Sequence, residues 1–294
     1  MTPRLDWARD ASDWPHREAS RFVSAGGLRW HVQQMGPLSG AAPVLLLIHG
    51  TGASTHSWRG LAQPLATRYR VLAVDLPGHA FTAMPTTGPA MSLPGMARAL
   101  GALLAALEVA PQIVVGHSAG AAIAARMCLD GLIAPKAVVC LNGALLPLAG
   151  LAGRFFSPLA KLLALHPLVP RLFAWRANEP AAVRRLIDGT GSTLDAEGVA
   201  LYSRLVRSPG HVAGALAMMA NWDLTPLAAE LPRLRPALLL IVGSNDLTLP
   251  PAQARRVAAL VPSARTVTLP GLGHLAHEEQ PQQVAHAILQ WVPP

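Results

Sequence analysis

Short apolar runs alternate with helix-prone stretches along most of the chain. A continuous apolar run is typical of a strand that is covered on both faces. Strands are predicted in this way at residues 44–48, 71–74, 112–115, 137–141 and 236–242, and a further strand is predicted near residues 265–269. Helices are predicted between them at about residues 55–67, 92–107, 119–129, 251–260 and 281–291. The alternation indicates right-handed crossovers and an α/β fold with a mostly parallel sheet.

The pattern differs at the start and in the middle of the chain. Residues 1–20 are polar and predict an extended arm, with Trp7 and Trp14 as anchors onto the core. Residues 21–23 and 28–34 flank Gly26-Gly27 and predict a β-hairpin. Between residues 144 and 222, proline-broken helical segments replace the alternation and predict an inserted helical cap. The predicted organisation is an arm, a core and a cap, at residues 1–20, 21–143 with 223–294, and 144–222.

The sequence Gly116-His117-Ser118-Ala119-Gly120 joins a predicted strand to a predicted helix. A serine on such a sharp turn holds its hydroxyl out above the end of a sheet, and glycines on both sides keep the turn clear of its neighbours. The G-x-S-x-G pattern alone is weak, but the strand before it and the helix after it are what the pattern requires. Ser118 is therefore the candidate nucleophile.

A serine needs a base to take its proton, and the base needs an acid to orient it. Asp246 follows the strand that ends at Val242, and His274 follows the last predicted strand. Read separately, the first is an ordinary turn aspartate and the second an ordinary loop histidine. Together with Ser118 they lie at carboxyl ends of strands, where ligands bind in such sheets, in the chain order Ser, Asp, His. The sequence predicts that the three form a catalytic triad.

A fourth strand ends in His49-Gly50-Thr51-Gly52, whose glycines allow a tight backbone turn. A main-chain N–H of Thr51, or alternatively of Gly52, can face the N–H of Ala119. Two such donors stabilise the oxygen anion of a tetrahedral intermediate. A tight turn without catalytic meaning is the alternative interpretation.

Composition indicates which partners and which cellular compartment to expect. Hydrophobic residues make up 51% of the 294, charged residues only 14%, and the formal net charge is +8. The basic residues are scattered, which disfavours nucleic acid as a partner. Two cysteines in apolar runs, Cys128 and Cys140, predict buried free thiols and a reducing compartment. No histidine spacing suggests a metal site, and neither a signal peptide nor a membrane-spanning run is evident, so a cytoplasmic location is expected.

The chain resembles the α/β-hydrolase superfamily from about Gly27 to Trp291. The stretches that carry the resemblance are HGTGAS, DLPGH, GHSAG, GSNDLTLP and GLGHLAHEEQP. It implies an eight-stranded sheet with helices on both faces, a helical cap, a Ser118–Asp246–His274 triad, and neither a metal nor an organic cofactor.

A narrower resemblance is to the BchO-type magnesium-chelatase accessory proteins of bacteriochlorophyll synthesis. It rests on DWPHREASRFVSAGGLRWHVQ, HGTGASTHSWRGLAQPL and DLPGHAFT; Ala80 departs from the glycine expected there. The resemblance implies a place near magnesium chelation, with a tetrapyrrole ester as substrate. A non-catalytic accessory protein that binds tetrapyrrole or chelatase subunits is the alternative, and a general carboxylesterase or carbon–carbon bond hydrolase is a third.

The predicted cap is both apolar and basic. Its large apolar residues are Phe155, Phe156, Leu162, Leu163, Leu165, Leu168, Phe173 and Trp175. Its basic residues include Arg154, Lys161, Arg171, Arg176, Arg184 and Arg185. This composition suits a flat hydrophobic ligand with carboxylates, such as a porphyrin, and equally suits peripheral contact with an anionic membrane surface. Ordinary solvated arginines are the third interpretation.

Overall fold

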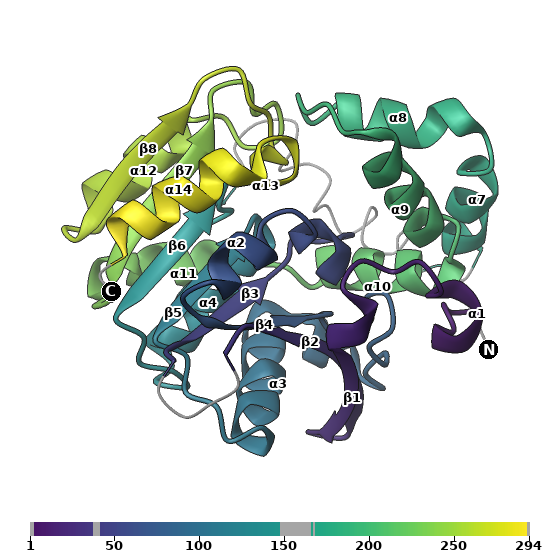
Figure 1. Ribbon diagram of the computed structural model, residues 1–294, viewed down its shortest axis with the longest axis horizontal. Helices are drawn as coiled ribbons and strands as arrows, with labels where there is room; N and C mark the ends of the chain where they lie inside the picture. The colour runs from purple at the N-terminus through teal and green to yellow at the C-terminus, as the bar shows by residue number, and fades with distance from the viewer. Residues whose placement is uncertain (1–2, 38–41, 148–165, 167, 293–294) are drawn as a thin grey trace.

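A twisted sheet forms the centre of the molecule (Figure 1). The structure is a computed structural model and describes residues 3–37, 42–147, 166 and 168–292. The eight strands lie in the order β1-β2-β4-β3-β5-β6-β7-β8. Their bounds are β1 Ser20–Ala25, β2 Leu28–Met35, β3 Val44–Ile48, β4 Arg70–Val74, β5 Ile113–His117, β6 Ala137–Leu141, β7 Ala237–Gly243 and β8 Ala264–Leu269.

The directions of the strands bring most of their carboxyl ends to one edge of the sheet. β1 and β2 form the predicted hairpin, and β2 is antiparallel to β4. From β4 onward, through β3, β5, β6, β7 and β8, neighbouring strands are parallel. Their carboxyl ends therefore meet at the same edge, and the α/β-hydrolase fold predicted from the sequence is confirmed.

Alternate residues of each central strand pack into apolar clusters on opposite faces of the sheet. In β3, Leu46 and Ile48 pack into one apolar cluster, whereas Leu45 and Leu47 pack into another on the opposite face. Both clusters continue into helices, so the sheet is covered on both sides. One face carries α3 Leu93–Ala106, α4 Ala119–Leu129, α11 Thr225–Glu230 and α12 Ala252–Leu260, and the other carries α2 Ala62–Ala66 and α14 Pro281–Trp291.

Helices occupy the described part of the chain between β6 and β7. α7, α8 and α9 stand together to one side of the sheet (Figure 1). The bounds are α7 Val169–Arg176, α8 Pro180–Asp188, α9 Ala196–Val206 and α10 Pro209–Ala220. The cap residues at 154–165 that the sequence singled out lie outside the described residues, and the limits of the arm, core and cap stay predictions. Leu172, Phe173 and Trp175 on α7 are exposed, and contact with a membrane also stays a prediction.

The N-terminal arm contains two short helical turns and is not extended throughout. α1 spans Trp7–Asp10, where the Asp6 carboxylate accepts a hydrogen bond from the Arg9 amide at 3.0 Å, and a 3-10 turn, η1, spans Arg17–Ala19. Trp14 is 2% exposed, and its Nε1 donates to Thr55 Oγ1 at 3.2 Å. The anchoring role predicted for this tryptophan is confirmed.

The helix predicted at residues 55–67 is wrong in extent. A 3-10 turn, η2 (Thr55–Trp58), is separated from α2 by a turn at Gly60, where a Cβ atom would lie 2.6 Å from Pro281. The other short elements are η3 Gly88–Met91, η4 Leu231–Arg233 and α13 Ala276–Glu279. Within the described ranges, none of the helices is long and apolar enough to span a membrane.

Candidate active site

Ser118 occupies the turn between β5 and α4 in a strained backbone conformation. Its φ is 51° and its ψ is −117°, a region that residues with side chains rarely adopt. The flanking glycines are required because added Cβ atoms would lie 2.5 Å from the Ala121 nitrogen at Gly116 and 2.1 Å from the Ile48 oxygen at Gly120. The turn can therefore pass this close to β3 and α4 only with glycine at positions 116 and 120.

Asp246 and His274 meet across the ends of β7 and β8. His274 Nδ1 lies 2.8 Å from Asp246 Oδ2, and both residues are buried. The amides of Thr248 and Leu249 each donate to Asp246 Oδ1 at 2.8 Å. A carboxylate oxygen accepts hydrogen bonds, so this contact places a proton on Nδ1, and in the neutral form of the imidazole Nε2 is then the nitrogen without a proton. This is the tautomer that a general base requires.

Asn142 completes the set of donors around Asp246, and sequence reasoning missed it. It follows β6, and its Nδ2 donates to Asp246 Oδ2 at 2.7 Å. Its φ of 44° lies in the left-handed region, which asparagine tolerates better than most residues. A polar residue directly after a buried strand, followed by Gly143, was the available signal. The identity of its partner depended on how β6 and β7 align.

Five of the six predicted site residues line one pocket, with a cavity volume of about 670 Å³. These are Thr51, Gly52, Ser118, Ala119 and His274. Asp246 does not line the pocket and lies behind His274. The loop after β3 approaches the serine closely, because a Cβ on Gly50 would lie 3.0 Å from Ser118 Cβ.

Main-chain amides beside Ser118 are available as donors. Ala119 begins α4, so its N–H belongs to the first turn, where helical amides have no partner within the helix. Within the described ranges, the amides of Thr51, Gly52 and Ala119 have no hydrogen-bond acceptor. The Gly52 oxygen accepts from His211 Nε2 at 3.0 Å, which fixes the loop. The N–H of Thr51 or that of Gly52 can therefore act as a donor together with the N–H of Ala119, and the choice between the two stays open, as it was from the sequence.

The pocket wall is almost entirely neutral. Asp223 is the one acidic or basic side chain besides histidine among the described residues that line it. The described cap arginines for which contact with a ligand was one interpretation, Arg171, Arg176, Arg184 and Arg185, are not part of this wall. The described pocket therefore favours an uncharged, apolar group next to Ser118.

A buried polar network joins the helices between β6 and β7 to the core. Glu278 on α13 accepts from Ser57 Oγ at 2.6 Å and from the Tyr202 hydroxyl at 2.8 Å, and it pairs with Arg59 Nη1 at 2.8 Å. Burial raises the pKa values of both Glu278 and Tyr202. Because Tyr202 belongs to α9 and lines the pocket, this network fixes one pocket wall.

Neighbouring histidines orient loops. His117 Nε2 lies 2.9 Å from the main-chain oxygen of His274, and the Leu76 amide donates to His49 Nε2 at 2.9 Å. Burial lowers the pKa of His117 well below its usual value, so this ring is neutral. In the described part of the chain, no three His, Cys, Asp or Glu side chains are arranged to hold a metal ion.

Comparison with known proteins agrees with this fold. Residues 43–281 match the model of the alpha/beta hydrolase fold family, and the chain belongs to that family. A hydrolase fold protein from Burkholderia ambifaria superposes with a TM-score of 0.76 at 23% identity, covering 99% of this chain and 100% of that one. The epoxide hydrolase CorEH superposes with a TM-score of 0.75 at 22% identity, covering 92% and 97%. At these identities the likeness concerns the fold alone.

Relatives of known name are similar along most of the chain. The magnesium-chelatase 30 kDa subunit of Rhodobacter capsulatus is 40% identical over 281 residues, covering 96% of this chain and 97% of that protein. The narrower resemblance inferred from the sequence, to the BchO-type magnesium-chelatase accessory proteins, is thereby confirmed. The pimeloyl-[acyl-carrier protein] methyl ester esterase of Aeromonas hydrophila is 28% identical over 285 residues, covering 86% and 96%.

Proposed function

We propose that the protein is a serine hydrolase that cleaves an ester or related carbonyl compound at Ser118. The single observation that carries the proposal is that His274, hydrogen-bonded to the buried Asp246, lines the same pocket as Ser118 on its strained turn. His274 Nε2 takes the hydroxyl proton as Ser118 Oγ attacks the carbonyl carbon. The carbonyl oxygen becomes an anion in the tetrahedral intermediate.

The other predicted residues also have roles in this reaction. The amides of Ala119 and of Thr51 or Gly52 donate to the oxygen anion, which typically contributes about 3 kcal/mol per donor. Asp246 orients His274 and stabilises the imidazolium ion. His274 then protonates the leaving alcohol, and an activated water molecule releases the acid from Ser118.

We infer that the part of the substrate beside Ser118 is apolar and uncharged. The described residues of the 670 Å³ pocket wall include no lysine or arginine, which supports this inference, because a buried carboxylate without a cationic partner is strongly disfavoured. The similarity to a protein named magnesium-chelatase 30 kDa subunit supports a proposed role of this reaction in bacteriochlorophyll synthesis, near magnesium insertion. A tetrapyrrole ester is then the proposed substrate, bound with its ester group in this pocket.

A second candidate is a non-catalytic accessory protein that binds the chelatase subunits or a tetrapyrrole. The name of the 40% identical relative favours it, since that protein is called a chelatase subunit and not a hydrolase. The two candidates differ in what they require of Ser118. An accessory role depends on the surface and the pocket, whereas hydrolysis depends on the hydroxyl group.

The deciding experiment is labelling with a fluorophosphonate probe. We expect wild-type protein to react and Ser118→Ala to remain unlabelled, with Ser263→Ala as the control. Ser263 donates to the Pro236 oxygen at 3.0 Å, away from the pocket, so its loss should change nothing. Protection by protoporphyrin or its magnesium complex would support a tetrapyrrole substrate. Absence of labelling in folded wild-type protein would refute the hydrolase proposal, and chelatase stimulation retained by Ser118→Ala would favour the accessory role.

A further inference from the structure

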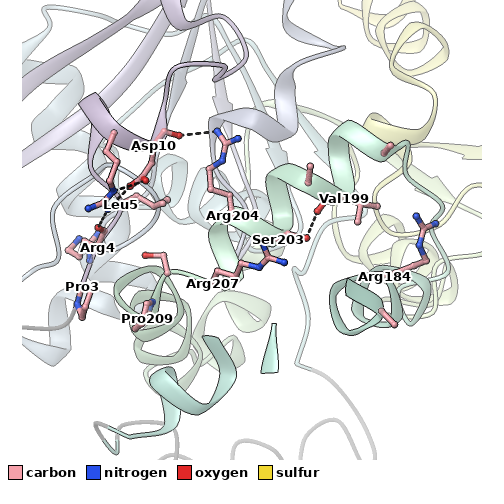
Figure 2. Close-up of a pocket in the computed structure, with 15 residues that line it drawn as sticks. Pro3, Arg4, Leu5, Asp10, Arg184, Val199, Ser203, Arg204, Arg207 and Pro209 are labelled. Atoms are coloured by element: carbon pink, nitrogen blue, oxygen red, sulfur yellow. Dashed lines mark hydrogen bonds and ion pairs between the residues drawn. The ribbon is translucent and has the colours of Figure 1, made fainter. Parts of the chain in front are cut away.

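A second large recess lies on the outer side of α9, between the N-terminal arm and α8 and α10. Its volume is about 900 Å³, and Figure 2 shows the side chains that line it. It shares no lining residue with the pocket over Ser118. Five arginines and one aspartate contribute to its wall: Arg4, Arg9, Arg184, Arg204, Arg207 and Asp10. We refer to it as the arginine groove.

Three of these arginines are engaged within the protein. Arg4 on the arm donates to the Thr82 and Gly210 oxygens at 2.6 and 3.4 Å. Arg9 pairs with the adjacent Asp10. Arg204 on α9 makes two hydrogen bonds to the carboxylate of Asp13, at 2.7 and 2.8 Å. These contacts hold the arm against α9 and α10 and so build one side of the groove.

The other two arginines have unused donors that line the groove. Arg207 donates from Nε to the Ala177 oxygen at 3.1 Å, and no described residue accepts from its two terminal nitrogens. Arg184 on α8 has no hydrogen bond or ion pair with any described residue. Both are exposed. The groove therefore presents two guanidinium groups that no described carboxylate neutralises.

The charges are spread across the groove and not gathered at one point. Five arginines against Asp10 leave the lining at +4, and the Asp13 carboxylate bound to Arg204 reduces this to +3. Figure 2 shows Arg4 on the side of the arm, Arg184 on the opposite side, and Arg207 between them. A single small anion would meet only part of this array, whereas a ligand with several separated negative charges would complement all of it.

The floor between these cations is formed by short side chains. Ala181, Ala196, Val199 and Ala200 contribute apolar surface from α8 and α9, and the Ser203 hydroxyl is turned back onto the Val199 oxygen at 2.7 Å. Short side chains leave room for a main chain to lie close to the helices. An acidic peptide can enter a recess between two elements, whereas the flat surface of a membrane contacts only its rim.

From this arrangement we propose that the arginine groove docks an acidic, Asp/Glu-rich segment of a partner protein. Carboxylates of the segment pair with Arg184 and Arg207, for which planar bidentate contacts are the preferred geometry. Its main chain lies over the floor of alanines. The proposal concerns a surface separate from the pocket, and it stands whether or not Ser118 is catalytic.

The test compares two double variants that remove the same charge. Arg184→Gln with Arg207→Gln removes the two unpaired cations from the groove. Arg185→Gln with Arg176→Gln removes two exposed arginines from α8 and α7 that do not line it. Binding of a fluorescein-labelled peptide of alternating Glu and Gly is measured by anisotropy, with a Gln and Gly peptide as the neutral control. Circular dichroism and thermal unfolding establish that each variant is folded.

We expect the acidic peptide to bind wild-type protein and the neutral peptide not to bind. The groove variant should bind about tenfold more weakly, from two partly exposed ion pairs, and the control variant close to wild type. Binding should also weaken as salt is raised to about 0.5 M. Equal losses in both variants would overturn the proposal, since net charge alone would then explain binding. So would groove-dependent binding to anionic vesicles without peptide binding, or no binding of the acidic peptide at low salt.

Discussion

Asn142 offers the sharpest test of how the site is built, because its amide contacts the acid and not the substrate. Nδ2 donates to Asp246 Oδ2 at 2.7 Å, while Asn142 itself does not line the pocket over Ser118. The change to make is Asn142→Gly. Glycine adopts the φ of 44° without strain, so the variant removes the hydrogen bond without straining the backbone.

The expected size of the effect follows from the environment of the bond. A hydrogen bond to a charged group contributes about 1.5–3 kcal/mol, and Asp246 is buried at 3% exposure. If that stabilisation acts on the imidazolium state of His274, its loss slows the reaction roughly tenfold to a hundredfold. The loss should appear in kcat, with KM little changed, because no group that lines the pocket is removed.

The assay measures hydrolysis of a p-nitrophenyl ester together with the rate of fluorophosphonate labelling at Ser118. Asn245→Gly is the matched control, since Asn245 adjoins Asp246 but donates to the Gly191 oxygen at 2.7 Å. We expect near wild-type rates for the control. Wild-type kcat in folded Asn142→Gly, or equal losses in both variants, would refute the reasoning that Asn142 positions the acid.

Three further predictions concern stability. Tyr202→Phe removes one hydrogen bond to the buried Glu278 and should lower the free energy of unfolding by about 2 kcal/mol in urea titrations. The effect should fall to about 1 kcal/mol in a Glu278→Gln background, where the hydroxyl still has an acceptor but an uncharged one. Burial would raise the pKa of Asp75, but pairing with the buried His31 outweighs it and lowers the pKa from 3.8 to about 2. The ionised carboxylate therefore stabilises the folded protein above pH 3.8, and this contribution is lost as the pH falls through 2. Asp75→Asn should therefore destabilise the protein by about 2 kcal/mol at neutral pH and by little near pH 2, and a constant difference between those pH values would contradict this. Gly120→Ala should destabilise by at least about 2 kcal/mol because its Cβ would lie 2.1 Å from the β3 main chain, whereas Gly101→Ala, with its nearest contact at 3.5 Å, should be neutral or stabilising by thermal unfolding.

Much of the fold could be predicted because its strands are apolar on both faces. The runs at 44–48 and 137–141 leave no polar face, so they were recognisable without knowledge of their partners. The helix boundaries after β3 were predicted less well. The break at Gly60 reflects the close approach of Pro281, which is more than two hundred residues away in the chain.

Candidate chemistry was visible in the sequence wherever a residue type and a strand end coincided. Ser118 and Asp246 each follow an apolar run that predicts a parallel strand, His274 follows the last predicted strand, and parallel strands bring their carboxyl ends together. Their proposed roles remain for experiment to test. Asn142 lacked such a signal, because an asparagine after a strand is common in turns.

By itself, the sequence determined the order of the elements, the strained turn that only glycine-flanked residues can form, and the strand ends from which the candidate residues project. These features depend on local sterics and on apolar periodicity, which are properties of residues close together in the sequence. Only the tertiary structure decided what each side chain contacts. It paired Asn142 with Asp246, kept the described cap arginines out of the neutral pocket, and set Arg184 and Arg207 in a separate groove against the N-terminal arm. Such pairings arise between segments far apart in sequence, whose relative positions depend on packing of the whole core.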